Sequence, residues 1–236
     1  MFGSFFAALS YRLPRDISIS KGRSMCPRCK SPIAWYDNIP LFSYIFLWGK
    51  CRHCKKPISP RYFIIELATA IGFFFVGSLG YGLIHTLFLL IIFSILVLIF
   101  VIDLEHQIIP DSLVFTGIFV TFAKLIIVDN QGIYQGFVSG LFAATFLLMV
   151  HLLTKGKGMG LGDVKFAILG GLLMGPKLTP VWLFLAFLTG AIVGIILILG
   201  RRAGLKDKIA FGPFLIVGLV ATYIWGPFII DFYFFN

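Results

Sequence analysis

Long apolar runs separated by short polar loops fill the chain from residue 62 onward. A helix needs about 20 apolar residues to cross the hydrocarbon core of a bilayer, so runs that approach this length predict transmembrane helices. The predicted spans are Tyr62–Leu79, Ile84–Ile102, Ser112–Val128, Ile133–Leu153, Val164–Met174, Val181–Leu199 and Phe211–Ile230. We expect the short run Val164–Met174 either to extend through Gly175–Pro180 or to sit thinly in the bilayer. The pattern predicts an all-α polytopic membrane protein with about seven to eight transmembrane helices.

The N-terminal quarter of the chain has a different texture. Its apolar stretch Phe2–Tyr11 is too short to cross a bilayer alone, so residues 1–11 are expected to form part of a first transmembrane helix or an interfacial helix. No basic region precedes this stretch, so a cleavable signal peptide is not expected. Residues 12–61 are polar, basic and rich in proline, and they contain all four cysteines. We therefore divide the chain into residues 1–11, a polar module at 12–61, which we call the cysteine module, and a transmembrane domain at 62–236.

Composition and charge placement agree with a membrane protein. Of the 236 residues, 59% are hydrophobic and 13% are charged, about half the charged fraction of a soluble domain. Eighteen of the twenty Lys and Arg residues lie in three segments, 12–61, 154–165 and 200–210. Basic residues concentrate on the cytoplasmic side of membrane proteins, so these segments are predicted to be cytoplasmic. Charge bunched in this way does not indicate nucleic-acid binding.

The four cysteines form two Cys-x-x-Cys pairs separated by 21 residues, Cys26 with Cys29 and Cys51 with Cys54. Two such pairs supply the four sulfur ligands of a tetrahedral zinc site. A redox pair is the alternative, but the predicted cytoplasmic side is reducing. We expect a zinc-ribbon-like module whose metal stabilises a segment too small to fold around its own core.

Two aspartates lie at the predicted cytoplasmic boundary of the membrane. Asp103 follows the apolar run Leu87–Ile102, and Asp163 follows Gly160-Leu-Gly162. A charge at such depth is costly and usually faces a protein interior or a water-filled cavity. If the two helix ends meet, one carboxylate could accept a proton from water while the other polarises a peptide carbonyl, and the glycines would permit close approach of a backbone. The spacing alone leaves open that both are ordinary interfacial carboxylates.

Two other acidic residues have expected roles. Asp111 directly precedes a predicted span and is expected to cap that helix at its N-terminus. Glu66 falls about one turn into a span and therefore needs a partner, either Arg61 or the cysteine module, or else has a functional role.

Taken in order, the motifs of the chain resemble those of bacterial type IV prepilin peptidases, also called prepilin leader peptidase/N-methyltransferases, which are aspartyl proteases of the GxGD kind. The resemblance covers essentially the whole chain. The matching stretches are Gly3-Ser4-Phe5, Tyr11-Arg12-Leu13-Pro14, the two cysteine pairs, Ile33-Ala-Trp35-Tyr36-Asp37-Asn38-Ile39-Pro40-Leu41, Pro57-Ile58-Ser59-Pro60-Arg61-Tyr62, Ile102-Asp103, Pro110-Asp111, Gly158-Met-Gly160-Leu-Gly162-Asp163-Val-Lys165 and Phe211-Gly212-Pro213-Phe214.

The resemblance implies that Asp103 and Asp163 are the two catalytic aspartates. It implies a multi-pass enzyme of the bacterial cytoplasmic (inner) membrane that removes the basic leader of type IV prepilins or type II secretion pseudopilins, cutting after a glycine. Family members with the four cysteines also methylate the new N-terminal residue with S-adenosylmethionine, whose binding site the sequence does not reveal. Members of the family usually have a longer first helix. An Asn that they commonly carry shortly after the Gly-Ser-Phe motif is replaced by Ala7 in this sequence.

Two other classes of function fit parts of the pattern. A transporter or channel with a zinc-stabilised cytoplasmic cap would need polar residues near the centres of its spans, whereas the acidic residues here cluster at one face. A noncatalytic scaffold of a secretion system would leave both aspartates dispensable.

Overall fold

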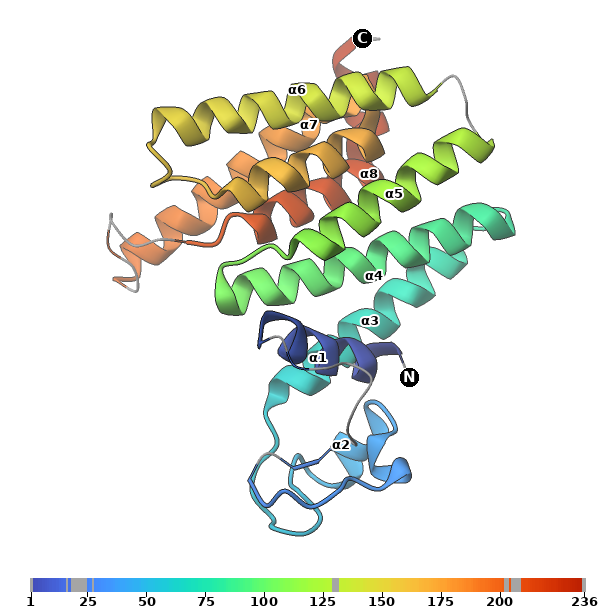
Figure 1. Ribbon diagram of the computed structural model, residues 1–236, viewed down its shortest axis with the longest axis vertical. Helices are drawn as coiled ribbons and strands as arrows, with labels where there is room; N and C mark the ends of the chain where they lie inside the picture. Colours follow the sequence, from blue (N-terminus) through green and yellow to red (C-terminus); the bar gives the residue numbers. More distant parts are fainter. Residues whose placement is uncertain are drawn as a thin grey trace. The chain divides into compact units, whose positions relative to one another are not determined.

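The computed structural model describes residues 2–15, 17, 25–26, 28–128, 132–201, 204 and 209–234. Regular structure in these residues is helical, apart from two isolated β-bridges in the cysteine module, so the predicted all-α fold is confirmed (Figure 1). Residues 18–24 of the predicted module and 205–208 of the last basic segment lie outside the described residues. The chain forms two compact units, Met1–Leu98 and Ile99–Asn236, which divide within the helix α4 (Leu83–His106).

The first unit contains α1 (Phe2–Arg12), η1 (Leu13–Arg15), η2 (Trp35–Asn38), α2 (Phe42–Phe46), α3 (Pro60–Ser78) and the first part of α4. The start of α3 follows from its sequence. The Ser59 side chain accepts a hydrogen bond from the Arg61 amide, and Pro60 occupies the first helical position, where its missing N–H costs nothing.

Helix α1 packs closely on α3. A Cβ atom on Gly3 would lie 2.7 Å from the Glu66 Cα atom, so this position has no room for a side chain. The Arg61 guanidinium donates hydrogen bonds to the Ala7 carbonyl at 3.2 Å and to Ser10 Oγ at 2.9 Å. These contacts fix residues 2–12 against the cytoplasmic end predicted for α3, while the choice between a transmembrane and an interfacial helix stays a prediction.

The second unit contains the end of α4, α5 (Asp111–Val128), α6 (Gly132–Leu153), α7 (Leu161–Leu199) and α8 (Gly212–Phe234). Glycines let these helices approach closely, as is common where helices pack within membranes. A Cβ on Gly171 of α7 would lie 2.5 Å from the Ser139 carbonyl oxygen of α6, and one on Gly218 of α8 would lie 2.8 Å from the Ala186 backbone nitrogen of α7. Helix α7 therefore packs between α6 and α8, which run beside it in Figure 1.

Helix α7 folds back on itself at Gly175, whose φ of 67° and ψ of −178° are not helical. In a straight helix, residues 170 and 182 would be about 18 Å apart along the axis. Instead Gly170 contacts the Trp182 ring, and the Phe166 and Trp182 ring centroids are 6.4 Å apart. The two apolar runs of this region are thus two packed helices, as the separate predicted spans require. The run Val164–Met174 therefore does not extend through Gly175–Pro180: the first helix ends at Gly175, and residues 176–180 begin the second helix.

Five helices, α3 to α7, are long and apolar enough to cross a membrane, and the described apolar part of α8 covers Gly212–Gly226. In this count α7 is a single helix, although it folds back at Gly175. The predicted number of spans therefore stays a prediction, while the multi-pass architecture agrees with these helices.

Candidate active site and metal centre

Asp103 lies in the last turns of α4 and is buried, with 4% of its surface exposed. Its Oδ2 atom has no hydrogen-bond partner of ordinary geometry among the described residues. A Cβ on Gly212, the first residue of α8, would lie 2.5 Å from this oxygen, so only glycine leaves room for the carboxylate. A buried polar atom without a partner is rare in folded proteins and often marks a catalytic group or a site for water.

Asp163 lies in the first turn of α7 and is 7% exposed. Its Oδ2 accepts a hydrogen bond of 2.9 Å from the Gly160 amide at the N-cap, the usual way in which an acid at the third helical position satisfies a free amide. His151 of α6 holds the preceding loop, because its Nδ1 lies 2.7 Å from the Met159 carbonyl oxygen. The carboxylate of Asp163 is therefore fixed from both sides of the turn that carries it.

Ile109, in the loop between α4 and α5, joins the two aspartate positions. A Cβ on Gly162 would lie 3.1 Å from Ile109 Cβ, and a Cβ on Gly212 would lie 3.2 Å from Ile109 Cδ1. The buried Ile109 side chain thus packs between the glycines that adjoin Asp163 and Asp103. The predicted pair is brought together in one buried cluster of the second unit.

Sequence reasoning missed Ile109 and Gly212 as parts of this cluster. The stretch Phe211-Gly212-Pro213-Phe214 was a signal, but nothing in the sequence alone says what Gly212 touches. The two glycines that precede Asp163 have structural roles that the sequence did not predict: Gly162 contacts Ile109, and Gly160 is the N-cap of α7. Their approach to a substrate backbone stays a prediction.

Asp111 has a different local role from the one expected. Helix α5 begins at Asp111, and the amides of Leu113 and Val114 in its first turn donate to the Pro110 carbonyl at 3.1 and 3.3 Å. Pro110 is therefore the N-cap, which corrects the prediction for Asp111. Both carboxylate oxygens of Asp111 instead accept hydrogen bonds from Lys165 Nζ, at 2.8 and 2.7 Å. This exposed ion pair links the starts of α5 and α7.

Glu66 finds its partner in the cysteine module. Its Oε2 accepts a hydrogen bond of 2.9 Å from the Leu41 amide at the start of α2, whereas Arg61 turns to α1. Of the two partners proposed from sequence, the structure supports the module. The carboxylate holds α2 against α3, next to the tilted rings of Tyr44 and Phe63, whose centroids are 5.2 Å apart.

The four cysteines come together in the first unit as two equivalent turns. In each turn the amide of the first cysteine and the carbonyl of the same residue form hydrogen bonds across the loop, Cys26 with Ser31 and Lys30, and Cys51 with Lys56 and Lys55. All four sulfur atoms lie within 4.8 Å of one another, and Cys26 Sγ is 4.0 Å from Cys54 Sγ. Tetrahedral zinc with bonds of about 2.3 Å requires sulfur atoms about 3.8 Å apart. The cluster therefore has the ligands and spacing to bind one metal ion.

The electrostatics of the cluster also favour a cation. Hydrogen bonds to Ser31 lower the pKa of the Cys29 thiol to about 6. At Cys54, a backbone hydrogen bond from Lys56 acts to lower the pKa, but desolvation and the three neighbouring sulfurs outweigh it and raise the pKa to about 11. Four thiols this close cannot all ionise beside one another unless a metal ion balances their charge.

The fold and these sites define a class: a multi-pass membrane protein with a buried aspartate pair and a tetracysteine module. Comparison with known proteins is more specific, and the chain belongs to the type IV leader peptidase family. Residues 90–195 match that family and residues 1–79 match the bacterial peptidase A24 N-terminal domain. The chain is thus a membrane-embedded enzyme of the peptidase class.

Three relatives, all named prepilin leader peptidase/N-methyltransferase, show the extent of the similarity. The Vibrio cholerae protein is 32% identical over 94% of this chain and 92% of its own length. The Bacillus subtilis protein is 32% identical over 99% and 94%, and the Pseudomonas aeruginosa protein is 34% identical over 86% and 71%. No solved structure matches the chain.

Proposed function

We propose that this chain removes the leader peptide of type IV prepilins or type II secretion pseudopilins, cutting after a glycine, and that Asp103 and Asp163 carry out the hydrolysis. The observation that supports this most is the buried aspartate cluster, in which two buried aspartates from distant parts of the chain adjoin glycines that pack on Ile109, and Asp103 Oδ2 has no hydrogen-bond partner among the described residues. Family membership supplies the peptidase class.

Two carboxylates held close together can divide the work of peptide hydrolysis. Like charges at close range do not both ionise easily, so the pair shares a proton. One carboxylate takes a proton from the attacking water while the other donates a hydrogen bond to the scissile carbonyl. The Gly160 amide orients Asp163, and the lack of a side chain at Gly212 makes room for the Asp103 carboxylate, whose Oδ2 is buried and has no hydrogen-bond partner among the described residues.

The direction of insertion supports a substrate with a basic leader. Eighteen of the twenty basic residues of this chain fall in segments assigned to the cytoplasm, and both aspartates lie at helix ends that adjoin that side. A prepilin whose leader is basic and whose following segment is apolar inserts with the leader in the cytoplasm by the same rule. Its scissile bond then lies at the depth proposed for the aspartates in the bacterial inner membrane.

The second part of the proposal concerns the cysteine module. We infer that Cys26, Cys29, Cys51 and Cys54 bind a structural zinc ion, and that the chain N-methylates the new N-terminal residue with S-adenosylmethionine. The close spacing of the sulfurs supports the metal, and the name shared by the relatives supports the methyl transfer. The zinc ion supplies folding free energy to a module with little core of its own.

The peptidase proposal is tested with purified enzyme in detergent and a prepilin substrate. Asp103→Asn and Asp163→Asn are each expected to lower the cleavage rate by about 10³-fold or more, because each removes a group that acts as part of one unit. Glu105→Gln is the matched control, since this exposed acid lies two residues from Asp103 on the same helix; it should cleave at the wild-type rate. Wild-type cleavage by either Asn variant would refute the aspartyl mechanism.

Methylation is tested on the same reactions by mass spectrometry of the processed product. With S-adenosylmethionine present, the new N-terminus should gain one methyl group, about 14 Da as a simple consequence of replacing N–H by N–CH₃. A cleaved product that never gains this mass would remove the methyltransferase part of the proposal and leave the peptidase part standing.

A further inference from the structure

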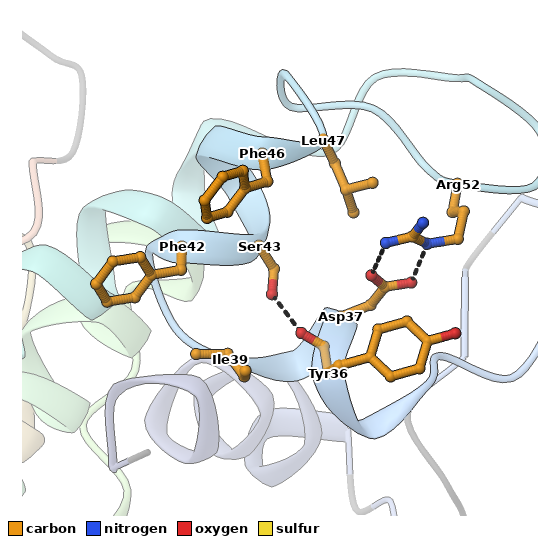
Figure 2. Close-up of a pocket in the computed structure, with 8 residues that line it drawn as sticks. All are labelled: Tyr36, Asp37, Ile39, Phe42, Ser43, Phe46, Leu47 and Arg52. Carbon is orange, nitrogen blue, oxygen red and sulfur yellow. Dashed lines mark hydrogen bonds and ion pairs between the residues drawn. The ribbon is translucent and has the colours of Figure 1, made fainter.

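The cysteine module contains a pocket of about 430 Å³ between η2, α2 and the second cysteine turn (Figure 2). Its lining residues are Tyr36, Asp37, Ile39, Phe42, Ser43, Phe46, Leu47 and Arg52. A cavity of this size falls in the range that holds a cofactor or a drug-sized ligand. All of its lining residues lie in the first compact unit, so the pocket is separate in the chain from the aspartate cluster.

One part of the pocket is apolar and open to solvent. The Phe42 and Phe46 rings project from consecutive turns of α2, and Ile39 lies below them in Figure 2. Phe46 is 78% exposed, so its ring contributes little to the packing of the module. Aromatic rings held at a rim in this way offer flat faces to a planar ligand.

The other part of the pocket is polar and rigid. Arg52 Nε and Nη2 donate to Asp37 Oδ2 and Oδ1 at 2.8 and 2.6 Å, a two-pronged pair drawn as dashed lines in Figure 2. The hydrogen bonds from Arg52 lower the pKa of the Asp37 carboxyl, which is therefore ionised at neutral pH. The Ser43 hydroxyl donates to the Tyr36 carbonyl at 3.0 Å, which ties η2 to α2 and fixes the shape of the pocket.

These groups match the chemistry of a methyl donor. S-adenosylmethionine has a planar adenine ring, a ribose with two hydroxyl donors, a sulfonium cation, and a methionine end with an ammonium and a carboxylate. The aromatic faces suit the adenine ring and the cation, the remaining lone pairs of Asp37 can accept from ribose or ammonium donors, and Arg52 retains N–H groups for a carboxylate.

We propose that this pocket is the binding site of S-adenosylmethionine, with Phe42 and Phe46 as the adenine-contacting wall and Asp37 and Arg52 as the polar anchors. The inference rests on the proposed methyltransferase activity, and it names the part of the chain that holds the donor. In the reaction the neutral α-amine of the processed substrate forms a bond to the methyl carbon. The carbon–sulfur bond breaks with its electron pair remaining on sulfur, which gives S-adenosylhomocysteine, and the methylated amine loses a proton to solvent.

The test measures binding rather than turnover. Zinc-loaded, full-length protein in detergent is titrated with S-adenosylhomocysteine in a calorimeter. Phe46→Ala and Asp37→Asn should each raise the dissociation constant about tenfold or more, which corresponds to the loss of one aromatic or charged contact. Ile45→Ala is the matched control, because Ile45 is 60% exposed on the same short helix and does not line the pocket; its dissociation constant should stay within twofold of wild type.

Three further measurements serve as controls: the zinc content, the rate of leader cleavage and amide hydrogen exchange. Zinc content and the rate of leader cleavage should be unchanged in all three variants, since none of these residues is a metal ligand or belongs to the second unit. In the wild-type protein, saturating S-adenosylhomocysteine should slow hydrogen exchange at the amides of residues 41–47. This last measurement does not depend on any substitution.

The outcomes separate the pocket from the proposed function. If wild type binds S-adenosylhomocysteine, but Phe46→Ala binds as tightly as Ile45→Ala and residues 41–47 show no protection, the donor binds elsewhere and the pocket assignment is wrong. If wild type neither binds the ligand nor methylates processed substrate, the methyltransferase part of the proposed function fails and takes this inference with it.

Discussion

The four cysteines sit on two short turns whose backbone hydrogen bonds close within six residues of the chain, whereas the two aspartates are sixty residues apart and meet only because helices pack. The cysteine cluster is built from short local turns, and its four thiols repel one another when they are ionised. The aspartate cluster has no such local scaffold and depends on Ile109, Gly162 and Gly212 for its shape. We therefore propose that the first site depends on a metal ion for its stability, whereas the second depends on the core of its unit.

Because of this contrast, each site should be disrupted by a different kind of substitution. Replacing a cysteine ligand should unfold the cysteine module without disturbing the aspartates, since the two clusters belong to separate compact units. Adding a single carbon at a helix contact should disable the aspartates without changing the metal. The following predictions use this difference, beginning with the largest expected effect.

The strongest test of the separation is the double variant Cys26→Ser with Cys51→Ser. Zinc should fall from about one ion per chain to below about 0.1, because a structural zinc site contributes about 10–16 kcal/mol to folding and two ligands of four are lost. Elemental analysis of purified protein measures the metal, and mass spectrometry of the product should show that methylation is lost.

Leader cleavage by the same variant should fall less than about tenfold. A loss as complete as that of Asp103→Asn would contradict the independence of the two units, and an unchanged zinc content would contradict the metal assignment. Cys29 and Cys54 remain in the variant, so disulfide formation should be excluded by assaying it in reductant.

The aspartate cluster is tested by Gly212→Ala. The new Cβ would lie 2.5 Å from Asp103 Oδ2 and 3.2 Å from Ile109, so the carboxylate must move. A displacement of about 1 Å can cost a catalytic group about 10²-fold in rate, and we expect kcat to fall by this order with little change in KM. Gly194→Ala is the matched control, because a Cβ at Gly194 of α7 meets no atom within 4 Å. Equal rates for the two alanine variants would show that the contact at Gly212 is unimportant.

The smallest expected effect belongs to the Lys165–Asp111 ion pair. Both side chains are about half exposed, and exposed pairs contribute about 1 kcal/mol or less. Lys165→Met should therefore lower the Tm slightly and change the cleavage rate less than about fivefold. A loss above 100-fold would instead give Lys165 a direct part in the chemistry beside Asp163.

The same contrast explains what could be predicted from the sequence. The cysteine cluster follows from the spacing within and between two pairs, which is the spacing typical of metal sites. The helices follow from run length, and Asp103 and Asp163 stand out because acids are rare at membrane depth. Contacts between distant helices have no such local signal: the packing of Ile109 and Gly212 around the aspartates, the bond from Leu41 to Glu66, and the fold-back at Gly175 emerged only in three dimensions.

Local rules also failed where a tertiary partner was available. Asp111 is a good N-cap residue, but Lys165 lies close enough to form two hydrogen bonds with its carboxylate, and Pro110 takes the cap position. The segment Gly175–Pro180 contains two prolines and a glycine, which favour a loop, but proline is accepted in the first turn of a helix, and the second helix of α7 begins there.

The most direct test of the central claim is a double-mutant cycle on leader cleavage under single-turnover conditions. If Asp103 and Asp163 work as one hydrolytic unit, the variant carrying both Asn substitutions should cleave within about threefold of either single variant, because the first substitution already abolishes the function of the pair. A double variant whose loss equals the product of the two single losses, or a single variant that retains the wild-type rate, would contradict the account.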